Sequence, residues 1–85
     1  MRIHHTNRFL KKLEKSPIKI QEAFKQKLRL FINDKNNPLL NNHKLAGQLN
    51  WYRSINITAD WRALFREDKD IIYFITIGTH SNLYK

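Results

Sequence analysis

Several residue types are missing or scarce in this chain, and each shortage excludes a class of protein. There is no cysteine, so a disulfide framework and a thiolate zinc site are excluded and a reducing compartment is favoured. Only two glycines are present, too few for a glycine-rich loop that holds a nucleotide cofactor. No apolar run reaches the length of a membrane span, and residues 1–5 lack the apolar stretch of a secretion signal. We therefore expect a cytoplasmic protein that needs no cofactor and no membrane.

Acidic residues are also scarce. Sixteen Lys and Arg residues stand against seven Asp and Glu, which gives a formal charge of +9. This imbalance favours a polyanionic partner, most simply a nucleic acid or an acidic protein. The basic residues concentrate in residues 8–35, where they form either a solvated helix surface or a surface that binds phosphates without sequence preference. In the second interpretation Lys11 and Lys12 contact RNA.

The first half of the chain has helical patterns. Residues 2–5 favour a short opening strand, and Thr6 is a predicted N-cap for a helix. Ser16-Pro17 predicts the start of a second helix, with Ser16 as N-cap and proline in the first turn, that stops before Pro38. The two segments are expected to form a helical hairpin.

The second half has strand patterns. Strands are predicted at residues 51–58, 61–66 and 71–77, with turns at 58–60 and 67–70. Gly78 is predicted to end the last strand, which is apolar enough to be buried on both faces, and the final seven residues to form a loop that returns across the sheet. We expect one α+β domain over residues 1–85, with an N-terminal helical hairpin packed on a small, mostly antiparallel four-stranded β-sheet.

Four polar residues outside the predicted core stripes are candidates for chemistry: His43, Asp60, Arg62 and His80. Each one alone has an ordinary explanation as an exposed loop or turn residue. Together they supply what RNA hydrolysis requires, namely one group to accept the 2′-hydroxyl proton, another to protonate the leaving 5′-oxygen, and a cation to offset charge on the phosphorane. Histidine titrates near neutral pH, and the guanidinium of arginine can bind a phosphate with two parallel hydrogen bonds.

Metal binding is another possible role for the histidines. No pair has the i, i+4 helical spacing of a metalloprotease motif, and the adjacent His4 and His5 would point to opposite faces of a strand. We therefore expect no metal.

Four short motifs resemble a known family in their order and separation. They are His43-Lys44-Leu45-x-Gly47, Tyr52-Arg53-Ser54-Ile55, Asp60-Trp61-Arg62 and Gly78-Thr79-His80-Ser81-x-Leu83-Tyr84. The chain resembles, over essentially its whole length, the YafQ branch of the RelE/ParE toxin superfamily. This resemblance implies a RelE-like fold and the toxin of a type II toxin–antitoxin system. Members of this branch cleave mRNA on the ribosome without a metal and so inhibit translation.

The resemblance also implies residue roles. The catalytic set would be His43, Asp60, Arg62, His80 and Tyr84, with the arginine stabilising phosphate and the tyrosine near the scissile nucleotide. The substrate-binding set would be Lys44, Arg53, Asn56 and Trp61, together with Lys11 and Lys12. Asn56 departs from the pattern, because YafQ has a second strand histidine there and an amide cannot exchange protons at neutral pH. The favoured division has His80 as general acid and His43 as base or base-orienting group, with the reverse assignment left open.

Two alternatives remain at the sequence level. ParE-like members of the superfamily poison DNA gyrase as binding proteins without nuclease activity, and an inactive remnant would only bind an antitoxin. Neither needs His43, Asp60 and His80 together. The expected partners are a cognate antitoxin with an acidic or amphipathic segment, mRNA in the ribosomal A site, and ribosomal RNA. The toxin alone is expected to be a monomer, and its complex with the antitoxin a hetero-oligomer.

Overall fold

The computed structural model describes residues 1–84. Along the chain, its elements are β1 (Arg2–His5), α1 (Asn7–Glu14), α2 (Ile18–Asn33), the 3₁₀ turn η1 (Pro38–Leu40), β2 (His43–Lys44), the 3₁₀ turn η2 (Gly47–Leu49), β3 (Arg53–Asn56), β4 (Trp61–Asp68), β5 (Ile71–Thr79) and α3 (His80–Leu83). None of the helices in this part of the chain is long and apolar enough to cross a membrane.

The strands form one sheet in the order β1-β5-β4-β3-β2. Only the β1–β5 pair is parallel, so the predicted α+β class and mostly antiparallel sheet are confirmed. The predicted number of four strands is wrong, because β2 adds a fifth strand at the edge beside β3. With two residues, β2 is too short to show the alternation that identifies a strand in a sequence.

The start of α1 is confirmed, whereas the predicted cap of α2 is wrong. Thr6 Oγ1 accepts a hydrogen bond from the Phe9 N–H at 3.2 Å and donates one to the Phe74 carbonyl at 3.0 Å, which ties α1 to β5. Ser16 does not cap α2, because its Oγ donates to the Lys12 carbonyl at 2.8 Å in the last turn of α1. The helix α2 begins after Pro17 without a side-chain cap.

The strand ends also differ from the prediction. The first strand of the second half is shorter, with residues 53–56 in place of 51–58, while β4 and β5 each extend two residues further than expected. Gly78 therefore lies inside β5, and the predicted terminal loop is the short helix α3. A Cβ at Gly78 would lie 3.3 Å from the Leu83 side chain, so glycine at this position allows α3 to fold back against the strand.

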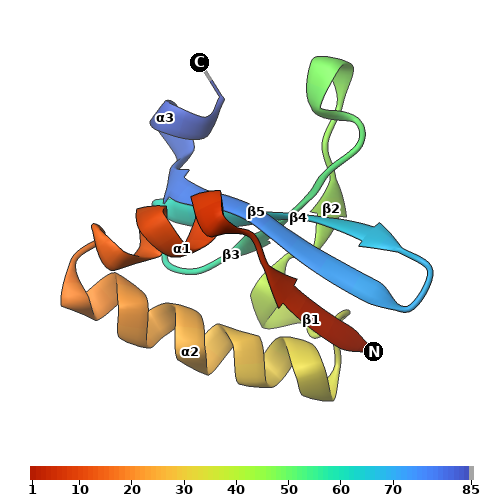
Figure 1. The fold of residues 1–85 in the computed structure, drawn as a ribbon, viewed down its shortest axis with the longest axis horizontal. Helices are drawn as coiled ribbons and strands as arrows, with labels where there is room; N and C mark the ends of the chain where they lie inside the picture. Colours follow the sequence, from red (N-terminus) through yellow and green to blue (C-terminus); the bar gives the residue numbers. More distant parts are fainter. Residues whose placement is uncertain (85) are drawn as a thin grey trace.

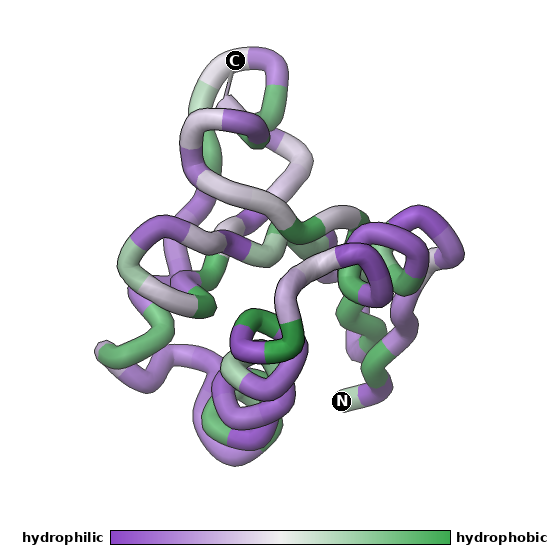
Figure 2. Tube along the Cα trace, turned by 90° about the vertical axis from the view of Figure 1, so that its left-hand side faces the viewer, coloured by the Kyte–Doolittle hydropathy of each residue, from purple (hydrophilic) through white to green (hydrophobic). Residues whose placement is uncertain are grey.

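The core lies between α2, α1 and one face of the sheet. In Figure 1, α2 runs below the sheet, and α3 and the segment containing η2 rise on the other side. All five phenylalanines are buried in this core with Ile20, Leu40, Ile55, Ile57, Ala63, Ile72 and Ile77. Figure 2 looks along α2 and shows that hydrophobic residues also occur on the side of this helix that faces away from the sheet. Two residues of α2, Ile18 and Ile32, are exposed. We call the side of the sheet opposite α2 the open face.

Candidate functional site

The open face is built from alternate residues of the three central strands. Ser54 of β3 lies beside Leu64 of β4, which lies beside Thr76 of β5. The next row on this face consists of Asn56, Arg62 and Gly78. Because alternate strand residues point to opposite faces, these side chains point away from α2. The sequence-predicted catalytic residues lie around these two rows, at the end of the sheet that leads into α3.

The helix α3 brings Tyr84 against β3, with the exposed His80 beside it. Their ring centroids are 4.6 Å apart with an interplanar angle of 68°, an edge-to-face contact. The Tyr84 hydroxyl donates to Ser54 Oγ at 3.2 Å. Ser54 is buried, and its Cα is paired with that of His43 on β2. The structure therefore brings His80, Tyr84 and His43 to the surroundings of one buried serine.

Asp60 contacts α3 through its backbone. It lies exposed in the bend before β4, and its carbonyl accepts a hydrogen bond from the His80 N–H at 2.8 Å. Among residues 1–84, its carboxylate takes part in no ion pair. The carboxylate is thus available to a ligand, while the main chain of Asp60 fixes the start of α3.

Arg62 braces the same bend. Its Nη1 donates to the carbonyls of Thr58, Ala59 and Trp61 at 3.0, 3.1 and 3.1 Å. These bonds give the side chain a structural role that the sequence did not suggest. A contact with phosphate would have to use the remaining N–H groups of the guanidinium.

The predicted substrate-binding residues are spread over a wider area. Arg53 Nε donates to Asn42 Oδ1 at 2.9 Å, and Lys44 is exposed on the edge strand β2. Asn56 Oδ1 is buried and accepts no hydrogen bond from residues 1–84. An unpaired buried acceptor is costly, so Asn56 is the member of this set most in need of a donor from a ligand.

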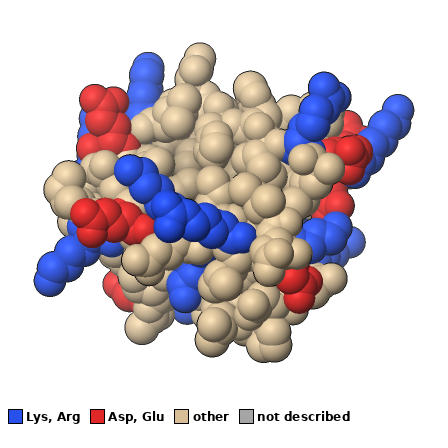
Figure 3. All heavy atoms as spheres, turned by 90° about the horizontal axis from the view of Figure 1, so that it is seen from below, with Lys and Arg blue, Asp and Glu red and all other residues tan. Residues whose placement is uncertain are grey.

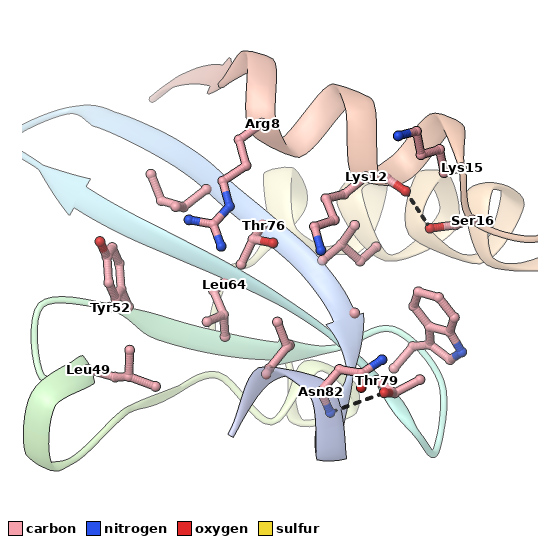
Figure 4. Close-up of a pocket in the computed structure, with 15 residues that line it drawn as sticks. Arg8, Lys12, Lys15, Ser16, Leu49, Tyr52, Leu64, Thr76, Thr79 and Asn82 are labelled. Atoms are coloured by element: carbon pink, nitrogen blue, oxygen red, sulfur yellow. Dashed lines mark hydrogen bonds between the residues drawn. The ribbon is translucent and has the colours of Figure 1, made fainter. Parts of the chain in front are cut away.

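A groove of about 420 Å³ lies between α1 and the open face. Figure 4 shows Arg8 and Lys12 reaching from α1 toward strand residues that include Thr76, with Tyr52 on the far side and Asn82 of α3 at one end. Thr76 is 5 % exposed, and its Oγ1 has no hydrogen-bond partner among residues 1–84. The groove thus combines cationic side chains with an unsatisfied hydroxyl, which suits an anionic ligand.

Most residues of the groove were not predicted from the sequence. Of the predicted site residues, only Lys12 and Trp61 line it, and Lys11 does not. The additional polar lining residues are Arg8, Lys15, Ser16, Tyr52, Thr76, Thr79 and Asn82. A signal for the basic ones exists, because Arg8, Lys12 and Lys15 have i, i+4, i+7 spacing and therefore share one side of α1. In this part of the chain the basic residues therefore form a stripe that faces the groove.

The remaining histidines belong elsewhere. The His5 ring stacks on Phe74 with centroids 5.7 Å apart and also contacts Phe9 and Phe24. This burial lowers the pKa of His5, and the neighbouring charge of His4 lowers it further. No group of three or more His, Asp or Glu side chains within residues 1–84 is placed to hold a metal ion.

Comparisons with known proteins give the family and the fold. Residues 1–85 match the family described as the bacterial toxin of type II toxin–antitoxin system, YafQ. The crystal structure of YafQ from E. coli BL21(DE3) is similar over 100 % of both chains, with a TM-score of 0.83 and 20 % identity. A chain of the E. coli DinJ–YafQ complex is also similar over 100 % of both chains, with a TM-score of 0.78 and 21 % identity.

A third solved structure has the same fold. The YoeB/ParE toxin from Agrobacterium tumefaciens is 20 % identical with a TM-score of 0.76, over 94 % of this chain and 99 % of that one. None of the curated proteins compared with the sequence matches it. At these identities the solved structures establish the fold alone, and the family rests on the match along the full sequence. The chain belongs to the YafQ family of toxins of bacterial type II toxin–antitoxin systems.

Proposed function

We propose that this toxin is a metal-independent endoribonuclease that cleaves mRNA in the ribosomal A site and thereby inhibits translation. The observation that carries the proposal is the cluster in which Tyr84 lies against His80 at 4.6 Å and donates to Ser54 at 3.2 Å, beside a groove lined by Arg8 and Lys12. Two side chains that we propose for catalysis, His80 and Tyr84, thus lie next to a cationic groove, and its volume of about 420 Å³ suits a nucleotide segment.

Cleavage would proceed through the 2′-hydroxyl of the substrate. His43 accepts the proton as base or orients the base, and the 2′-oxygen attacks phosphorus. His80 protonates the 5′-oxygen as the P–O bond breaks, which leaves a 2′,3′-cyclic phosphate and a new 5′-hydroxyl. Asp60 orients one of these two histidine rings through its carboxylate. Arg62 offsets the negative charge of the phosphorane. Tyr84 supports the scissile nucleotide with its ring.

The surrounding residues would position the RNA. Asn56 accepts a hydrogen bond from the substrate through its unpaired Oδ1, and Trp61 supports the site from the groove wall. Lys11, Lys12 and Lys44 contact phosphates of mRNA or ribosomal RNA, while Arg53 is preoriented by Asn42. These contacts supply the salt-dependent part of the affinity.

The second proposed partner is a cognate antitoxin. E. coli YafQ forms a complex with DinJ, and a net charge of +9 on this chain suits an acidic antitoxin segment that folds on binding. We propose that such a segment covers the groove. The toxin alone is then a monomer, and its complex with the antitoxin is a hetero-oligomer.

The test is brief induction of the chain in bacterial cells, followed by mapping of mRNA 5′ ends by primer extension. New 5′-hydroxyl ends within translated codons are expected, and His80→Ala should reduce them by roughly 10²- to 10⁴-fold. Ser81→Ala is the matched control, because Ser81 is exposed in the next position of α3. Growth arrest with intact mRNA and broken DNA would instead identify a gyrase poison. No arrest and no cleavage would identify an inactive, antitoxin-binding protein.

A further inference from the structure

A row of planar side chains crosses the open face next to the groove. His4, Tyr73 and Arg66 are register partners on β1, β5 and β4. Tyr52 and Trp51, just before β3, border the same hollow as Arg66. We call His4, Tyr73, Arg66, Tyr52 and Trp51 the planar row. The row thus runs across the sheet and consists of an imidazole, two phenols, a guanidinium and an indole.

Tyr73 contacts two members of the planar row, and Arg66 shares a hollow with the other two. The His4 and Tyr73 rings meet edge to face, with centroids 5.6 Å apart and an interplanar angle of 69°. The guanidinium carbon of Arg66 lies 5.1 Å from the Tyr73 ring centroid. Trp51 is 77 % exposed, so most of its ring surface is open to a ligand. The hollow that it shares with Tyr52 and Arg66 has a volume of about 410 Å³.

The planar row and the groove are on the same side of the sheet. Phe65 and Phe74 are buried in the core, so their neighbours Arg66 and Tyr73 point to the open face. Tyr52 and Ile75 line both the groove and the hollow beside Trp51, so the two lie next to each other. A strand of nucleic acid in the groove therefore reaches the row without crossing an edge of the sheet.

We propose that the planar row stacks on the bases of a single-stranded RNA segment whose phosphates follow α1 in the groove. The proposal rests on the proposed function for the identity of the RNA as substrate. Flat aromatic and guanidinium groups stack on unpaired bases with little dependence on sequence. The site is therefore an accessory base-binding surface, adjacent to the residues of bond cleavage.

The charge distribution orients the bound strand. Arg8, Lys12 and Lys15 lie on the groove side of the row, whereas Asp68 and Asp70 lie at the turn between β4 and β5. Phosphates are attracted to the first group, and the turn offers no comparable attraction, since Asp68 is acidic and Asp70 is paired with the Met1 amino group at 3.2 Å. A guanidinium at the centre of the row also favours a planar, anionic ligand over the apolar side of a protein helix. The bases then cover the row while the backbone follows α1.

The test measures binding of a fluorescein-labelled single-stranded RNA of mixed sequence by anisotropy. The parent carries His80→Ala, so that the RNA stays intact. Trp51→Ala should weaken binding about tenfold, and Trp51→Phe should recover most of the loss because it keeps a stacking ring. Ile18→Ala is the control, since Ile18 is also strongly exposed but lies on α2, away from the open face.

Salt dependence separates stacking from charge. The loss in Trp51→Ala should be the same factor at low and high salt, whereas Lys12→Gln should reduce the slope of log affinity against log salt by roughly 0.7. Arg66→Gln should weaken binding severalfold. The proposal is overturned when Trp51→Ala and Arg66→Gln both bind within twofold of the parent, or when the parent binds no RNA.

Two further outcomes are distinguishable. Loss of antitoxin binding in Trp51→Ala with unchanged RNA affinity would assign the row to a protein interface and overturn the proposal. Cleavage is measured separately in the chain that retains His80. Absence of cleavage refutes the proposed nuclease activity, yet a tenfold loss of RNA affinity in Trp51→Ala would still support the row as a base-binding surface.

Discussion

The two faces of the sheet use aromatic rings in different ways. All five phenylalanines lie on the side covered by helices, each no more than 2 % exposed. All three tyrosines lie half-buried on the open face. A phenol differs from a phenyl group by one hydroxyl, which needs a partner when buried. The difference separates the face that stabilises the fold from the face that is free to bind.

Charged side chains of one sign do not gather on the helix-covered side (Figure 3). Viewed from below, that side carries basic and acidic side chains together with large areas that are neither. The groove on the open face, in contrast, is lined by three cationic side chains and no carboxylate. The binding side is therefore distinguished by where the basic side chains point, more than by the total charge of the chain.

The largest effect should come from a core ring. Phe74→Ala is expected to lower the free energy of unfolding by about 3–5 kcal/mol, because Phe74 contacts the rings of Phe9, Phe24, Phe31 and Phe65. Tyr73→Ala, one position away on the open face, should cost about 1 kcal/mol. Urea unfolding measures both. Equal losses would refute the division of the two faces.

The next effect concerns the basic stripe. Arg8→Glu with Lys12→Glu should weaken binding of single-stranded RNA more than tenfold at low salt and flatten its salt dependence. Lys19→Glu with Lys25→Glu on α2 changes the net charge equally and should have a smaller effect. Adding Lys11→Glu to Lys12→Glu tests whether Lys11 contributes from outside the groove. Equal losses in the two double variants would reduce the stripe to a solvated surface.

A smaller effect is expected at the contact between α3 and β3. Tyr84→Phe removes the donor to Ser54 and should lower the free energy of unfolding by about 0.5–1.5 kcal/mol. Tyr73→Phe is the matched control, because the Tyr73 hydroxyl makes no hydrogen bond with residues 1–84. Thermal unfolding of both variants, combined with a cleavage assay, would show whether fixing α3 also matters for activity.

The smallest effect is a pH dependence of stability from His5. Because burial lowers the pKa of His5 in the fold, the unfolded chain binds more protons once the pH falls below about 6.5. The free energy of unfolding should therefore decline as the pH falls through this range, and level off below the folded pKa. His5→Phe should lose this contribution, while His43→Gln should keep it. Urea unfolding across the pH range decides the matter.

Local patterns predicted those elements whose signals lie close together in the sequence. The α1 helix and its Thr6 cap follow from adjacent residues, and so do the strands β4 and β5. The helix α3 could not be predicted in this way. It depends on the space that Gly78 leaves for Leu83 and on the hydrogen bond between Tyr84 and Ser54. These two residues lie far apart in the sequence, so no local pattern reveals their contact.

The candidate site shows the same limit. Residue type and position predicted His43, Asp60 and His80 as candidates, and the roles that the motif resemblance assigned to them remain predictions. Thr76 was missed because a threonine in an apolar strand is ordinary, and only the packed sheet leaves its hydroxyl without a partner. Arg62 was expected to bind phosphate, and its three bonds to carbonyls of the preceding bend are visible only in three dimensions.

The position of β5 has a consequence for the synthesis of this toxin. It is the strand that joins β1 to β4, and it comes last among the strands in the sequence. A nascent chain that ends before residue 71 has no neighbour for β1 and only one side of β4 satisfied. Phe74, the ring on which the other core rings converge, is also missing. The ribosome thus completes most of the chain before the toxin can fold.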